Sequence, residues 1–166
     1  MIATLAISQA TTLQRLAVDD MIRQSTAIVR ATVTGTYAVQ RGLDIYTYYQ
    51  FQVTETLKAG PAKIQEVAVP GGALNGQRQL AAGSPQLTKG QDYVIFLWTG
   101  KSGMTQVIGL SQGLFTVMQD DSSQTVLVRG PVDGLMLDRS GRVVSDRGLT
   151  IKLSDLRTQI QKALGQ

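Results

Sequence analysis

Alternation of apolar and polar residues is the dominant pattern in the middle of this 166-residue chain. The two-residue period runs from Val29 to Thr34 and again from Tyr49 to Leu57. Successive side chains of a β-strand point to opposite faces, so this period predicts strands with one buried face. Further short strands are expected at residues 66–69, 92–98, 105–110, 114–118 and 125–129, with weaker candidates at 135–137 and 143–144.

The segment Tyr93–Trp98 differs from the other strands because every position in it is apolar. A strand of this kind is typical of the centre of a sheet, where both faces are covered. We therefore expect Ile95 and Leu97 to be buried on one side and Val94 and Phe96 to be buried on the other.

Helical spacing marks the two ends of the chain. Near the N-terminus it predicts a helix capped by Thr11 or Thr12, with the apolar stripe Leu13, Leu16, Ala17, Met21 and Ile22. Near the C-terminus it predicts a helix that is capped by Ser154 and followed by Gly165, with the apolar stripe Leu156, Ile160, Ala163 and Leu164.

Many short strands separated by glycine and proline turns indicate a mainly β fold, a barrel or a sandwich. Residues 71–90 have no period, and loops of that length are usually functional or close a barrel end as a plug. The glycine-rich stretch from Gly71 to Gly76 is interpreted as a flexible loop. We expect a single domain over residues 11–166.

The amino-acid composition excludes several classes of catalytic and metal site. The chain contains no histidine and no cysteine, which excludes histidine-based triads and thiol nucleophiles and removes nearly every zinc or copper site. We therefore expect no metal and no cofactor. The net charge is +4, but the basic residues are scattered from Arg15 to Lys162, which argues against a nucleic-acid partner.

The five residues Gly109-Leu110-Ser111-Gln112-Gly113 match the nucleophile elbow of serine hydrolases. A working elbow needs a strand before it, a helix after it and a base for the serine proton. Here the residues after Gly113 predict another strand, and imidazole is absent. We interpret the motif as a turn, so a catalytic Ser111 is the least favoured hypothesis.

Paired carboxylates offer a second hydrolytic chemistry. The two glutamates, Glu55 and Glu66, lie on or beside strands with polar neighbours. Aspartates gather at predicted turns, where their side chains bind the local backbone: Asp120, Asp121, Asp133 and Asp138. We expect these aspartates to serve turns and not catalysis.

Three residues form the candidate ligand-binding row. If Tyr49 faces the core, then Tyr46, Tyr48 and Gln50 share the outer face of the same strand. Barrels of the OB type bind oligonucleotides or sugars on such a face. The alternatives are that neighbouring side chains cover the tyrosines or that tyrosine serves here as a good strand former. Trp98 is expected to be a core or rim residue and not a ligand contact.

The order of these segments resembles the netrin-type module, the barrel shared by tissue inhibitors of metalloproteinases. The resemblance runs through residues 25–33, 49–60 and 89–97 and the terminal helix. Residues 12–117 are also similar to uncharacterised exported bacterial proteins. The resemblance implies an OB-like β-barrel with an N-terminal and a C-terminal α-helix. Inhibition through an N-terminal cysteine is not implied, since the chain has none.

The first ten residues carry an apolar run, Ile2–Ile7, followed by the small-x-small triplet Ser8-Gln9-Ala10. A signal-peptide remnant or a frayed leader explains this pattern, and we favour the first. That choice predicts export to the periplasm, the envelope or the extracellular space. No stretch reaches the roughly 20 apolar residues of a membrane-spanning helix.

Together these patterns predict a non-enzymatic exported domain with a binding or structural role, whose partner is an unknown protein or glycan. The alternative is an oligosaccharide or single-stranded nucleic-acid binder that uses the face around Tyr46 and Tyr48. A hydrolase is the least favoured function.

Overall fold

The computed structural model describes residues 12–60 and 63–165. Its elements in chain order are β1 Thr12–Gln14, α1 Val18–Gln24, β2 Ala27–Arg41, β3 Asp44–Lys58, β4 Glu66–Pro70, β5 Gly72–Leu74, β6 Gln77–Gln79, β7 Asp92–Thr99, β8 Thr105–Val107, the 3-10 helix η1 Leu110–Gly113, β9 Leu114–Gln119, β10 Thr125–Arg129, β11 Leu135–Leu137, β12 Val143–Val144, β13 Leu149–Lys152 and α2 Leu153–Ala163. The prediction of a mainly β chain is confirmed.

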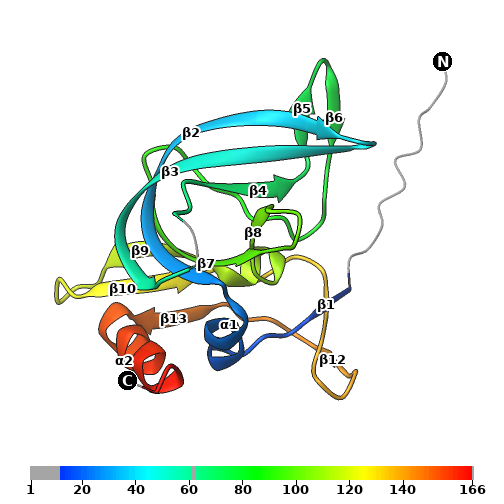
Figure 1. The fold of residues 1–166 in the computed structure, drawn as a ribbon. Helices are drawn as coiled ribbons and strands as arrows, with labels where there is room; N and C mark the ends of the chain where they lie inside the picture. Colours follow the sequence, from blue (N-terminus) through cyan, green and yellow to red (C-terminus); the bar gives the residue numbers. More distant parts are fainter. Residues whose placement is uncertain (1–11, 61–62, 166) are drawn as a thin grey trace.

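Most strands belong to one antiparallel sheet in the order β13-β10-β9-β7-β2-β3-β4, and β8 pairs with the end of β7. In Figure 1 the long strands β2 and β3 curve over the rest of this sheet. Their curvature brings β4 against β8. Among the described residues, however, no ladder of hydrogen bonds joins β4 to β8.

Strand β7 lies between two hydrophobic cores. Ile95 and Leu97 belong to the first core, between the curved strands, while Val94 and Phe96 belong to the second core, beneath the helices. All four side chains are fully buried. The prediction of a central strand with these two faces is therefore confirmed.

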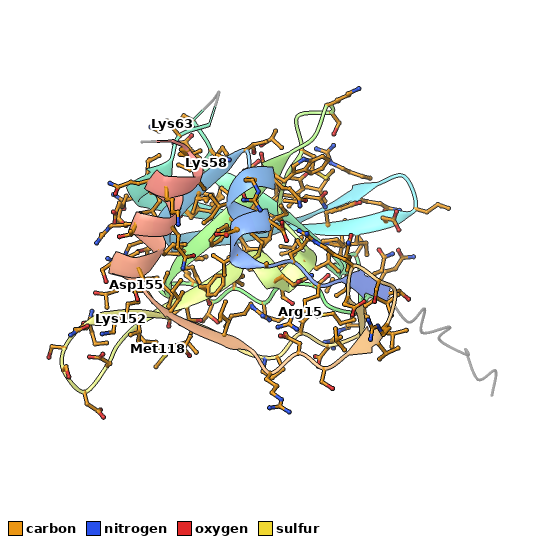
Figure 2. The ribbon with its side chains drawn as sticks, turned by 90° about the horizontal axis from the view of Figure 1, so that it is seen from below. Arg15, Lys58, Lys63, Met118, Lys152 and Asp155 are labelled. Carbon is orange, nitrogen blue, oxygen red and sulfur yellow. The ribbon has the colours of Figure 1, made fainter. Side chains whose placement is uncertain are left out.

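The helices α1 and α2 cover the second core, and Figure 2 shows them side by side on that face. Lys58, at the end of β3, fastens α1 to the sheet. Its ammonium donates to the carbonyl oxygens of Ile22 at 2.7 Å and Ser25 at 2.6 Å, at the helix C-terminus where a cation is favoured. Burial lowers the pKa of Lys58. Within the described residues, no helix has the length and apolarity needed to cross a membrane.

The N-terminal helix is shorter than predicted. It begins at Val18, while Leu13 lies in β1, which pairs in parallel with β11. Side chains distant in sequence override the local helical pattern, because the buried Gln112 amide binds the backbone at Gln14 and Leu16.

The C-terminal helix packs three residues of the predicted apolar stripe against the second core: Leu156, Ile160 and Ala163. Leu164, by contrast, is the exposed C-cap. Gly165 follows the helix as predicted, at a φ of 72°. The helix begins at Leu153, and Ser154 forms no capping hydrogen bond there. The position of this helix was therefore predicted, but its cap was not.

The segment 71–90 contains a hairpin instead of the flexible loop predicted for its first residues. Asn75 and Gly76, both with positive φ, form the turn between β5 and β6. In Figure 1 this hairpin stands beside the tip of the β2–β3 hairpin. Further along, Leu87 is buried in the first core.

Candidate functional site

The register of β3 confirms the predicted alternation. Tyr49 packs against the first core and Phe51 lies within it, so Tyr46, Tyr48 and Gln50 share the opposite face. Gln50 is exposed and Tyr46 is half-buried.

Tyr48 is not the open ring that the sequence suggested, since it is only 7% exposed. The ring of Tyr37, its partner on β2, stacks on it with the centroids 5.2 Å apart and the planes 11° apart. The guanidinium of Arg41 lies 5.6 Å from the centroid of the Tyr48 ring. For Tyr48 the structure therefore bears out the alternative that neighbouring side chains cover it, and Tyr46 and Tyr48 do not form an accessible pair.

Tyr37 is the exposed ring of this stack, and sequence reasoning missed it. Its side chain is 42% exposed, and its hydroxyl donates a 2.9 Å hydrogen bond to Glu66. Desolvation, together with the hydrogen bond and the negative charge of Glu66, raises the pKa of Tyr37. The hydroxyl is therefore a donor at neutral pH. Predicting Tyr37 from the sequence would have required the register of the β2–β3 hairpin, because that register pairs Tyr37 with Tyr48.

The tyrosine row borders a cleft of about 480 Å³ at the contact between β4 and β8. Tyr48 pairs with Ala68 and Tyr46 pairs with Pro70, and both of these β4 residues line the cleft. We call this hollow the Trp98 cleft, after the tryptophan that lines it. Its volume falls within the range of small-ligand sites.

Trp98 is the single tryptophan of the chain and is 46% exposed. It lies at the rim, one of the two places predicted for it. A Cβ atom on Gly100 would come within 3.0 Å of the indole, so glycine there leaves room for the ring. Trp98 is held at the end of a strand whose preceding residues are fully buried, which gives the indole a rigid base.

The described residues that line the Trp98 cleft include no ionisable side chain. The polar side chains are the amides of Gln24, at the end of α1, and Gln106, on β8. Proline and aliphatic residues supply most of the remaining wall: Pro70, Pro85, Ile108 and Leu110. The arrangement offers one aromatic face and two amides that can donate and accept hydrogen bonds.

The elbow-like motif has a structural role. Ser111 lies in η1 and is followed by β9, so the predicted turn between strands is confirmed. The amide of Gln112, only 2% exposed, accepts from Leu16 N–H and donates to the Gln14 carbonyl, each at 2.9 Å. A Cβ on Gly113 would lie 2.8 Å from Ile108, which explains the second glycine of the motif.

The two glutamates have partners in other elements. Glu55 accepts two hydrogen bonds of 2.9 Å from Arg157 on α2, and Glu66 accepts from Tyr37. The side-chain hydrogen bonds of Arg157 hold the pKa of Glu55 below its usual range. A depressed pKa does not suit a general acid near neutral pH.

The predicted turn role of the aspartates is confirmed for Asp120 and Asp138. Each accepts backbone hydrogen bonds from residues two and four positions further along the chain. In the described part of the chain, no group of three or more acidic side chains is placed to hold a metal ion.

Comparisons with protein-family models, curated proteins and solved structures found no match to this chain. The Trp98 cleft, the hollow without charged side chains beside the predicted row, is therefore the basis of the functional proposal.

Proposed function

We propose that this chain is a non-catalytic binding domain and that the Trp98 cleft is its contact surface. The observation that carries the proposal is a half-exposed indole on the wall of a largely apolar hollow. Pre-formed hollows with apolar walls and a few placed polar groups are typical of ligand sites. Tyr46, which pairs with Pro70, is the more accessible of the two row tyrosines at the border of the cleft.

A non-catalytic role is supported by the positions of the candidate reactive groups. Ser111 lies in a tight turn of a chain without histidine, and each glutamate is bound to a side chain of another element. A nucleic-acid partner is disfavoured because phosphate contacts dominate such binding and the described cleft lining carries no basic residue.

Two finer features belong to the same proposal. The contact of β4 with β8 supports an OB-like barrel built from β2, β3, β4, β7 and β8. Export, with a protein or glycan of the envelope as partner, is supported by the apolar run and small-x-small triplet of residues 1–10, which lie outside the described residues.

Nuclear magnetic resonance of the isotope-labelled chain tests this proposal. A panel of small uncharged fragments, including methyl glucosides and capped dipeptides, is titrated while the backbone amides and the single indole N–H are followed. We expect shifts of the Trp98 indole and of the Gly109 and Leu110 amides, which border the cleft. Shifts confined to other surfaces, or none with any fragment, contradict the proposal. Labelling of Ser111 by a fluorophosphonate contradicts the non-catalytic role.

A further inference from the structure

We infer that the Trp98 cleft binds an uncharged oligosaccharide. This inference rests on the proposed binding function and names the class of ligand. It follows from the charge of the lining, the kinds of side chain on the walls and the shape of the surface around the cleft.

The chemistry of the cleft matches a neutral sugar. One face of a pyranose ring presents C–H groups, which pack well on an aromatic ring, while its edge carries hydroxyls. The indole of Trp98 supplies the aromatic face, and the amides of Gln24 and Gln106 supply donors and acceptors for hydroxyls. Gln24 is exposed and Gln106 is half-buried, so a ligand can reach both amides.

The absence of charge in the cleft favours uncharged ligands over charged ones. Clusters of arginine or lysine normally bind phosphates and carboxylates, and none of the described lining residues is of that kind. An acidic ligand would lose water at this surface without gaining a charged partner. Neutral hydroxyls have a smaller desolvation penalty, and the two amides offset it.

A second hollow adjoins the Trp98 cleft. It has a volume of about 310 Å³ and shares Pro70 and Pro85 with the Trp98 cleft. Its wall includes Tyr49 and Gln86, and Arg78 is its charged member among the described residues. Two hollows with two lining residues in common are neighbours, and neighbouring hollows suit a short polymer better than a monosaccharide.

A peptide fits the same surface less well. Extended peptides bind by adding a strand to an open sheet edge, but the edges of β4 and β8 at the cleft lie against each other. Proline-rich peptides use grooves lined by several aromatic rings, and Trp98 is the one aromatic residue among the described residues of the cleft.

Titration with defined hexasaccharides tests the inference. The uncharged probes are cellohexaose, chitohexaose and laminarihexaose, and the comparison probes are an acidic heparin hexasaccharide and a proline-rich decapeptide. Because Trp98 is the single tryptophan, a change in its fluorescence reports binding at the cleft. We expect at least one uncharged hexasaccharide to bind with a Kd of about 1 mM or tighter, with little dependence on salt.

Three variants locate the binding by calorimetry. Trp98→Ala should weaken the hexasaccharide affinity by about tenfold or more, and Gln106→Ala should weaken it less. Met118→Ala is the matched control, since Met118 is a 51% exposed apolar side chain on β9 outside the cleft lining, labelled in Figure 2. We expect the control to bind as the wild type does.

The outcomes separate this inference from the proposed function. If none of the three uncharged hexasaccharides binds, or if Trp98→Ala binds as well as Met118→Ala, the oligosaccharide assignment is overturned. If the decapeptide alone binds and requires Trp98, the glycan assignment fails but the cleft remains a binding site. Preference for the heparin fragment also overturns the assignment.

Discussion

Phe96 and Trp98 lie two residues apart on the same face of β7, yet one is fully buried and the other is 46% exposed. The Phe96 ring packs beside Phe115, with centroids 5.7 Å apart, in the core that α1 and α2 cover. Trp98 lies beyond that cover, in a cleft bordered by Gln24, the last residue of α1. Phe96 and Trp98 lie on one continuous face of β7, but α1 and α2 cover only the part of that face around Phe96.

This difference indicates where to look for function. Burying an indole is favourable, yet α1 ends at Gln24 beside the cleft and nearly half of the Trp98 side chain stays exposed. An exposed tryptophan beside a hollow is therefore more informative than the apolar pattern of the strand itself. The covered part of the face stabilises the fold, whereas the open part is available to a partner.

The largest expected effect belongs to the covered side. Phe96→Ala should lower the free energy of unfolding by about 3–5 kcal/mol, because a fully buried aromatic ring is lost and a cavity remains. Chemical denaturation of the variant and the wild type measures this change. A loss below about 1 kcal/mol would show that β7 is not a central strand and would break the comparison.

Charge gives a second contrast, because the covered side carries a buried ion pair and the described cleft lining has none. Arg129 donates two hydrogen bonds to Asp146, and both side chains are nearly inaccessible. The Arg129 hydrogen bond, followed by the backbone N–H groups of Val132 and Gly148, holds the pKa of Asp146 below its usual 3.8.

A depressed folded-state pKa means that the stabilisation from Asp146 is present above pH 4 and is lost as the pH falls through the folded value. Asp146→Asn should therefore reduce the free energy of unfolding by about 1.5–3 kcal/mol at pH 7. The gap between variant and wild type should narrow as the pH falls below the ordinary pKa of 3.8, as urea titrations at several pH values can measure. A gap that is independent of pH would show that the carboxylate charge is unimportant.

The elbow-like turn contributes to both regions. Gly109 and Leu110 line the Trp98 cleft, whereas Gln112 accepts a hydrogen bond from Leu16 in the segment after β1. Gln112→Leu should cost about 1–3 kcal/mol, since it removes two part-buried hydrogen bonds and leaves the Leu16 N–H and the Gln14 carbonyl without their partner. Hydrogen exchange should show faster exchange at Leu16. The matched variant Ser111→Ala should change stability by about 0.5 kcal/mol or less. Equal losses in both variants would contradict the role given to Gln112.

Local patterns predicted the strands of the sheet well, because alternation reports directly on which face is buried. The observed bounds of β10, β11 and β12 agree with the predicted ranges, and the two faces of β7 agree residue by residue. The hairpin of β5 and β6 was missed although Asn75-Gly76 is a known hairpin signal.

Features that depend on distant residues could not be predicted from local patterns. Leu13 joins β1 because it meets Met136 and because Gln112 binds the adjoining backbone. The cover over Tyr48 comes from Tyr37, and their pairing follows from a hairpin turn whose register the local pattern did not give. The Trp98 cleft combines residues of α1, β4, β7 and β8, so only the assembled fold reveals it.

The central claim, that the open end of this face serves binding and not folding, is tested most directly by the stability of Trp98→Ala. The account predicts a loss of less than about 1 kcal/mol in chemical denaturation, because a half-exposed rim side chain creates little cavity. A loss as large as that of Phe96→Ala would show that Trp98 is a core residue and would contradict the claim.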